Sequence, residues 1–190
     1  LARQAITLNR LNQESAALSK WQEIVGRDTS RATVGLRQFS ILQCAQLFSQ
    51  QGHPADALHL LRQAIAQPPY QQAPLLLASA NIRLKFFKDF SGARRAYTTI
   101  FELYPDSDVV DEAVFGLAQC AEEERSFEDA IQSYSHYLRA FRSGDQVEKA
   151  ESLRYYLQQF QPVGAATVQN ELQRFIASHT ATEDKADVAH

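Results

Sequence analysis

Methionine is absent from this 190-residue chain, and cysteine, glycine and proline are scarce, with two, seven and six residues respectively. Two cysteines cannot build a disulfide-rich scaffold, and so few glycines and prolines are unusual for a loop-rich β protein. A primary translation product begins with Met, whereas this chain begins with Leu1. We therefore expect it to be a piece of a longer protein, and we expect an N-terminal extension to stabilise it.

An excess of positive charge is also missing. Lys and Arg together number 19 and Asp and Glu 22, which gives a net charge of −3. A protein that binds nucleic acid through its phosphates usually carries a basic excess on some face, so nucleic acid is not an expected partner. Arg94 and Arg95 form the densest basic pair, and we interpret them as a solvated helix surface rather than a phosphate site.

No apolar run is long enough for a membrane span. The longest, residues 74–78, falls far short of the roughly 20 residues that a transmembrane helix requires. No secretory signal is visible at Leu1. Direct membrane insertion is therefore not expected within this chain, and the compartment is left open between the cytoplasm and the bacterial periplasm.

Apolar residues that recur at spacings of three and four are abundant, and this spacing is typical of amphipathic helices. Leu153, Tyr156, Leu157 and Phe160 are one example. Sustained alternation with a period of two is missing, so strands are not expected. Between glycine and proline breakers the pattern predicts helices over residues 1–11, 13–25, 31–51, 54–66, 73–88, 90–104, 108–124, 127–142, 146–160 and 164–178.

Four of these helices repeat one phrase, an alanine followed four residues later by a large side chain. Twelve residues before each of these alanines stands another alanine in three cases and Asn81 in the fourth. Small residues let two helices approach closely, and a large side chain beside them fills the remaining gap. We therefore predict paired helices with these structural repeat positions: Ala17, Trp21, Ala45, Ala57, Ala93, Tyr97, Ala118, Ala130 and Tyr134.

A single helical hairpin cannot bury its apolar face, so neighbouring hairpins must stack and share a core. The repeat thus predicts an all-α fold, a right-handed α-solenoid of about five antiparallel helical hairpins. We place one domain over residues 1–178, with hairpins over 1–25, 31–66, 73–104, 108–142 and 146–178. The last hairpin lacks the phrase and is expected to be a divergent capping unit. Residues 179–190 are expected to form a polar, flexible tail.

The repeat resembles the tetratricopeptide repeat (TPR) family, best over residues 39–105 and 109–142. Gly52 and Pro105 fall where that family places a turn glycine and a closing proline. Residues 104–107 and 115–118 are similar, more narrowly, to bacterial members that assemble or coordinate the cell envelope. The spacing of 36 to 40 residues and Asn81 at a small-residue position depart from the family pattern, whose period is about 34.

Residues that could support catalysis or bind a metal are few. Cys44 and Cys120 fall on predicted inner faces and are interpreted as buried, unpaired thiols. No two histidines stand with a carboxylate at helical metal-ligand spacing, and no glycine-rich phosphate loop occurs. We interpret residues 122–124, three glutamates, as a solvated acidic helix end. One of residues 106–108 is expected to cap the following helix. We therefore expect no enzyme, no metal and no cofactor.

Stacked hairpins curve, and their first helices line a concave surface that suits an extended or helical peptide. TPR members that bind the carboxylate tails of heat-shock chaperones use Lys, Asn and Arg in this groove, whereas only Lys85 is basic here. An apolar or amphipathic segment, with basic residues facing Glu112 and Glu122, is the better expectation. The predicted groove residues are Phe39, Leu42, Gln46, Leu75, Ile82, Lys85, Phe86, Phe115, Gln119 and Glu122.

The function we expect is that of a non-catalytic protein–protein interaction scaffold that binds a peptide or helix of a partner protein. An alternative is self-association, or a structural role within a longer chain, in which Phe39, Leu75 and Ile82 pack against an adjacent hairpin or a second copy. An RNA-binding helical repeat is a third possibility. It would need stacking aromatics at fixed positions of every repeat, and the chain does not have them.

Overall fold

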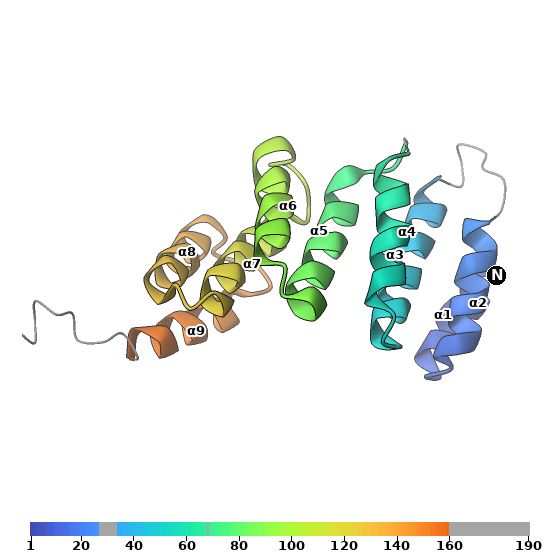
Figure 1. Ribbon diagram of the computed structural model, residues 1–190, viewed down its shortest axis with the longest axis horizontal. Helices are drawn as coiled ribbons and strands as arrows, with labels where there is room; N and C mark the ends of the chain where they lie inside the picture. The colour runs from blue at the N-terminus through green and yellow to red at the C-terminus, as the bar shows by residue number, and fades with distance from the viewer. Residues whose placement is uncertain (27–33, 68, 160–190) are drawn as a thin grey trace, which may run out of the picture.

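The fold was analysed in a computed structural model that describes residues 1–26, 34–67 and 69–159. The described residues form an elongated row of helices with no strand (Figure 1). The predicted all-α fold is confirmed. The helix predicted over residues 164–178 and the tail of residues 179–190 lie outside the described residues. The helices are α1 (Ala2–Arg10), α2 (Glu14–Val25), α3 (Val34–Gln50), α4 (Pro54–Ile65), α5 (Gln72–Ile82), η2 (Arg83–Phe87), α6 (Phe90–Leu103), α7 (Val110–Glu123), α8 (Phe127–Ala140) and α9 (Val147–Gln159).

Each helix packs against the next along the whole row, from α1 on α2 to α8 on α9. In addition, α3 contacts α5 and α5 contacts α7. The first helices of neighbouring hairpins therefore lie side by side, which is the arrangement of stacked helical hairpins. The predicted solenoid of helical hairpins is confirmed.

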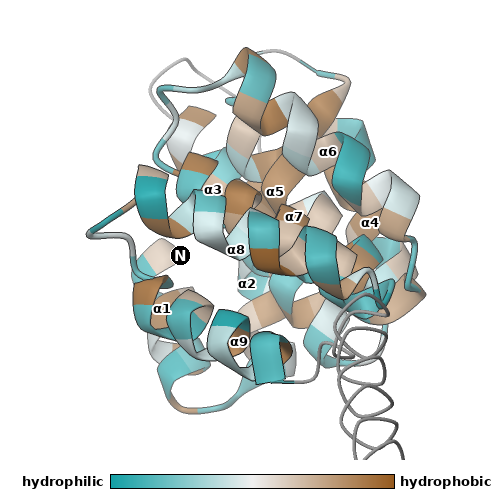
Figure 2. Cartoon of the chain, turned by 90° about the vertical axis from the view of Figure 1, so that its left-hand side faces the viewer, coloured by the Kyte–Doolittle hydropathy of each residue, from teal (hydrophilic) through white to brown (hydrophobic). Residues whose placement is uncertain are grey.

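The structural repeat positions form the centre of the packing. All nine of them are at most 1% exposed. The core consists of four clusters along the row, and each contains one copy of the alanine and its large partner, such as Ala17 with Trp21 and Ala93 with Tyr97. Figure 2 looks along the row from the α9 end and shows hydrophobic positions between the helices and hydrophilic ones outside.

The four hairpin turns share one backbone conformation. Asn12, Gly52, Lys88 and Arg125 all adopt the left-handed region, with φ between 51° and 82°. In three of these turns the N–H of the next residue donates to the carbonyl five positions earlier, as in Ser126 to Ala121, which is the hydrogen bond of a Schellman C-cap. Gly52 and Asn12 are residue types that favour this conformation, whereas Lys88 and Arg125 are common inside helices and did not signal it.

The predicted helix over residues 73–88 is interrupted. α5 ends at Ile82 and is followed by a π-helix, η2, in which the Arg83 carbonyl accepts from the N–H of Lys88 five positions later. The same carbonyl also accepts from the N–H of Asp89 where the turn ends. Apolar spacing cannot reveal one such widened turn, because it changes the direction of only a few side chains. Lys85, Phe86 and Phe87 are all exposed on this turn.

The predicted cap of α7 is wrong. The helix begins at Val110, and its N-cap residue, Val109, makes no side-chain capping hydrogen bond. The Ser107 hydroxyl instead donates to the neighbouring Asp108 carboxylate at 3.4 Å. The polar residues 106–108 therefore form the turn before the helix and do not cap it.

Candidate protein-binding groove

A hollow of about 480 Å³ lies between the first helices of two neighbouring hairpins. It is formed by one face of α3, one face of α5, the η2 turn and the residue that precedes α7. Because α3 and α5 are in contact along the row, the two faces form one continuous surface. The lining residues are Leu42, Gln43, Ala45, Gln46, Ser49, Gln50, Pro74, Leu77, Ala78, Asn81, Ile82, Lys85, Phe86 and Val109.

Five of the predicted groove residues meet in this hollow: Leu42, Gln46, Ile82, Lys85 and Phe86. Phe86 is 41% exposed, and the Lys85 ammonium lies 5.3 Å from the centre of its ring. This cation–π contact holds the lysine charge beside an apolar surface. The π-turn therefore places an aromatic ring and a cation together at the rim of the hollow.

The polar part of the lining is rich in side-chain amides, with Gln43, Gln46, Gln50 and Asn81. Each amide offers both a hydrogen-bond donor and an acceptor, which is what a peptide backbone complements. Asn81 is anchored, because its side-chain oxygen accepts from the Tyr97 hydroxyl at 2.6 Å. The other repeats have an alanine at this position, so Asn81 stands out in the sequence. It was nevertheless not among the predicted groove residues.

Two predicted groove residues, Leu75 and Phe115, are buried outside the hollow, and a third, Ile82, is mostly buried at its edge. Leu75 is 0% exposed within the core of the second hairpin, and Ile82, which borders the hollow, is 7% exposed. Phe115 is 4% exposed and packs between Tyr134 and Tyr137, with ring centroids 5.5 and 5.6 Å apart. Helices α5 and α7 each lie between two neighbouring hairpins. Together these hairpins cover more than one face of each helix. Leu75 and Phe115 are therefore core residues, and Leu75 and Ile82 pack against the second hairpin.

Phe39 lies outside the hollow. It is 45% exposed, and its ring packs edge-on against Trp21 at 5.6 Å between centroids. The contact joins α3 to α2, so Phe39 covers the large residue of the first repeat.

The three glutamates at the end of α7 are engaged with neighbouring side chains. Glu122 accepts from the Tyr134 hydroxyl at 2.7 Å, and Glu123 pairs with Lys88 at 2.9 Å. Glu124 forms an ion pair with Arg94. Burial, followed by the hydrogen bond to Glu122, raises the pKa of Tyr134. This end of α7 therefore joins two repeats, and one carboxylate oxygen of Glu122 is already bound within the chain. Gln119 is half-buried and outside the hollow.

Near the start of α7 lies a second acidic region. Desolvation, together with the neighbouring carboxylates of Asp111, Asp145 and Asp108, raises the pKa of Glu112. None of these four carboxylates lines the hollow between α3 and α5. Among the described residues that line the groove, Lys85 is therefore the only one with a charged side chain.

Both cysteines are buried and unpaired. Burial raises the pKa of the Cys44 thiol to about 12 and that of Cys120 to about 11. A thiol is a nucleophile only as its thiolate, so neither is activated near neutral pH. Among residues 1–26, 34–67 and 69–159, no group of three or more His, Cys, Asp or Glu side chains is placed to hold a metal ion. In the same residues no helix combines the length and apolarity needed to cross a bilayer.

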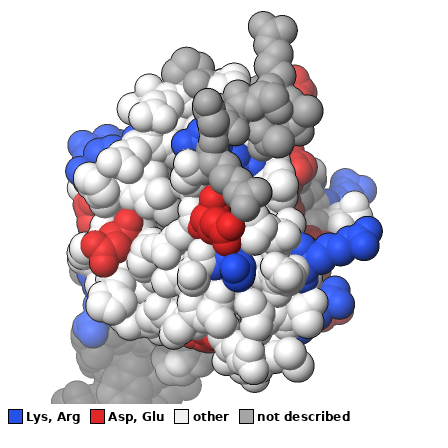
Figure 3. Space-filling model, turned by 90° about the vertical axis from the view of Figure 1, so that its right-hand side faces the viewer, with Lys and Arg blue, Asp and Glu red and all other residues white. Residues whose placement is uncertain are grey.

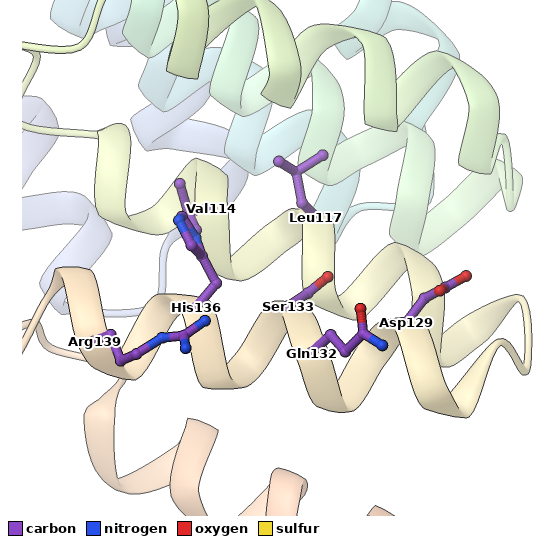
Figure 4. Close-up of a pocket in the computed structure, with 7 residues that line it drawn as sticks. All are labelled: Val114, Leu117, Asp129, Gln132, Ser133, His136 and Arg139. Atoms are coloured by element: carbon purple, nitrogen blue, oxygen red, sulfur yellow. The ribbon is translucent and has the colours of Figure 1, made fainter.

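A second hollow, of about 460 Å³, lies along α8 (Figure 4). Val114 and Leu117 come from α7, and the remaining lining residues come from α8: Asp129, Gln132, Ser133, His136 and Arg139. The His136 ring contacts Phe101 of α6 edge-on at 6.3 Å. One carboxylate, one guanidinium and neutral polar groups make this hollow a mixed polar surface. The sequence did not single it out.

The N-terminal end of the row shows no concentration of charge. In the view of Figure 3 most of the surface that is drawn as described is uncharged, and the acidic and basic side chains are scattered over it. An electrostatic footprint for nucleic acid would be a continuous basic face. The part of this end that Figure 3 displays has no such face.

Stacked hairpins with a buried small-and-large repeat define an α-helical repeat protein. The family model described as the tetratricopeptide repeat matches residues 42–88 and 86–145. These stretches cover more than half of the chain and include α4 to α8 and most of α3, so the chain belongs to the tetratricopeptide repeat family. No curated protein matches the chain. Tetratricopeptide repeats generally act as non-catalytic scaffolds for protein–protein interaction.

Proposed function

We propose that the chain is a non-catalytic scaffold that holds a segment of a partner protein in the groove between α3, α5 and η2. The observation that carries this proposal is the meeting of five predicted groove residues, from two hairpins, around one hollow. At its rim Phe86 remains substantially exposed although it is a large aromatic residue. Partly exposed aromatic rings beside an apolar hollow are typical anchors of protein–protein contacts.

The lining defines the chemistry of the partner segment. Leu42, Ile82 and Phe86 favour an apolar side chain, and the glutamines and Asn81 favour hydrogen bonds to exposed peptide groups. The only charge in the lining is the Lys85 ammonium, so complementarity favours an acidic group in the partner. We therefore propose an apolar segment that carries an acidic residue next to its anchor, in place of the basic segment that the sequence suggested.

Selection of displayed peptides on the immobilised chain, followed by fluorescence anisotropy on a selected peptide, tests this proposal. We expect selected peptides to combine a bulky apolar residue with an acidic one. Phe86→Ala should weaken their binding at least about tenfold, because truncating a hot-spot aromatic residue costs about 2 kcal/mol or more. Lys85→Gln should weaken binding less and reduce its dependence on salt.

Phe101→Ala is the matched control. Phe101 is 42% exposed against 41% for Phe86, but it lies on α6 outside the groove. Peptide affinity should therefore be unchanged in this variant. Equal losses in the two variants, or an unchanged affinity in Phe86→Ala, would contradict the groove. Phe115 is unsuitable for such a test, because a change at this buried ring disturbs the core.

Self-association is the competing occupant of the same groove. Light scattering across a dilution series distinguishes it, because a self-associating chain loses mass on dilution. We expect a mass that does not change with concentration. A mass that falls on dilution, and that is monomeric throughout in Phe86→Ala, would assign the groove to a second copy of the chain.

A further inference from the structure

Three arginines from three helical elements surround a small hollow on the other side of α5 from the groove. Arg62 of α4, Arg83 of η2 and Arg95 of α6 all line this space of about 280 Å³, which we call the arginine pocket. Its floor on α5 is formed by Leu76 and Ser79, which the groove does not use. The complete lining is Leu58, Arg62, Ile65, Leu76, Ser79, Arg83, Gly92, Arg95, Ala96 and Thr99.

One of the three guanidinium groups is held in place. Arg83 Nη1 donates to an Asp89 carboxylate oxygen at 2.6 Å, and the other oxygen accepts from the N–H of Gly92 at 2.9 Å. A Cβ at position 92 would overlap both the Asp89 carboxylate and the Arg83 guanidinium, so only glycine leaves room for this arrangement. The charge of Arg83 is balanced by Asp89, and its remaining N–H groups can serve a further acceptor.

The other two arginines are not balanced by a carboxylate. Among the described residues, the ion pairs of the chain include neither Arg62 nor Arg95. Arg94, by contrast, is paired with Glu124. The basic pair of the sequence therefore divides, with one arginine joined to the next repeat and the other lining the pocket. Two uncompensated positive charges remain beside one preoriented guanidinium.

The next repeat supplies an internal comparison. The second hollow, along α8, is lined by Asp129, Gln132 and Ser133 at the positions that Gly92, Arg95 and Ala96 occupy one repeat earlier (Figure 4). A carboxylate replaces the glycine, and a neutral amide replaces the arginine. The geometry of the repeat therefore does not by itself require a basic lining, and the next repeat does not reproduce the arginine at position 95.

We propose that the arginine pocket binds a phosphate group. Guanidinium groups complement tetrahedral oxyanions through paired hydrogen bonds, and two unbalanced charges match a group of about −2 near neutral pH. Ser79 and Thr99 add hydroxyls to the lining. A volume of about 280 Å³ lies just below the range of small-molecule sites, which suits a single phosphate group better than a nucleotide.

Titration calorimetry with inorganic phosphate, against chloride at matched ionic strength, tests the pocket. We expect saturable binding of phosphate. Arg95→Gln, which copies the residue of the neighbouring repeat, and Arg62→Gln should each weaken it at least about tenfold, because each removes a charge-assisted hydrogen-bond donor. Both arginines are exposed, so the melting temperature without phosphate should stay close to that of the parent and confirm folding.

Arg10→Gln is the control, because it removes the same charge from an exposed site on α1. Equal weakening in this variant, or phosphate binding no stronger than that of chloride, overturns the proposal. A capped phosphoserine tripeptide distinguishes the source of the group. Tighter binding than inorganic phosphate assigns the pocket to a phosphorylated chain, and equal binding assigns it to the free anion. Phe86→Ala should leave phosphate affinity unchanged, so this result is independent of the groove.

Discussion

Gly116 of α7 lies in close contact with Tyr97 of the preceding repeat. A Cβ at this position would stand 2.5 to 2.8 Å from three ring carbons of Tyr97. Tyr97 is 0% exposed, and its hydroxyl is bound to Asn81, so the ring cannot move aside. Because Gly116 has no side chain, the Tyr97 ring fits against α7.

Gly116→Ala should lower the free energy of unfolding by about 1–3 kcal/mol, because the added methyl overpacks a closed contact. Chemical denaturation with a circular dichroism readout measures the change. Gly35→Ala is the control, since nothing lies within 4 Å of its added Cβ. It should be neutral or stabilise the chain by up to about 1 kcal/mol. Similar losses in both variants would show that the contact with Tyr97 does not limit this position.

The buried thiols predict how stability depends on alkaline pH. Their ordinary pKa of 9.0 is raised to about 12 at Cys44 and about 11 at Cys120 in the folded chain, first of all by burial. Above about pH 9 the unfolded chain therefore loses protons that the folded chain retains. The contribution is fully present below pH 9, and the free energy of unfolding falls as the pH rises toward the folded values.

Denaturation midpoints at about pH 8 and about pH 10.5 measure this decline. The double variant Cys44→Ala, Cys120→Ala should decline less steeply than the parent. Part of the decline should remain, because burial also raises the pKa of Tyr97 and Tyr134. An identical decline in parent and double variant would contradict the thiol contribution.

At the scale of the elements, a left-handed backbone conformation costs free energy at residues other than glycine. Among the hairpin turns, the one at Gly52 avoids this cost. Gly52 adopts the left-handed conformation freely, whereas Lys88 and Arg125 hold it against the steric preference of their Cβ atoms. Arg125→Gly should raise the free energy of unfolding by about 1 kcal/mol. Lys88→Gly should gain less, because it also removes the ion pair with Glu123. Thermal denaturation compares the variants, and a loss of stability in Arg125→Gly would contradict the shared turn.

The extent of the helices could be predicted closely from the sequence. α2 and α4 begin and end within about one residue of their predicted bounds, because apolar spacing and breakers such as Pro54 act locally. The η2 turn could not be predicted, since the hydrogen bond from Asp89 to the Arg83 carbonyl leaves no mark on residue type. The left-handed turns at Lys88 and Arg125 were missed for the same reason.

The candidate sites were predictable only in part. Leu42, Gln46 and Phe86 share a hollow because helical period places them on one side of α3 and of the α5–η2 segment. Phe115 has the periodic position of Leu42 two repeats later but is covered by Tyr137 and Lys149, which come from other helices. The arginine pocket likewise depends on residues far apart in sequence, so spacing within one helix does not indicate it.

At the scale of the whole molecule, the groove and the arginine pocket lie on opposite sides of α5. The hairpin of α5 and α6, which contributes to both sites, is joined to the next hairpin by two exposed ion pairs and by the buried cluster around Tyr97. Exposed ion pairs contribute little, so the buried cluster provides most of this cohesion. α5 is held in place by a close-packed core. One of its sides lines the groove, and the other lines the arginine pocket.

Hydrogen–deuterium exchange of the chain, with and without a selected peptide, tests the central claim of a concave groove most directly. Binding there should slow exchange in α3 and in the segment from α5 to η2, the elements that line the hollow. Exchange in α8, whose hollow lies elsewhere, should be unchanged. Protection confined to α4, α6 or α8, with none in α3 and α5, would contradict the account.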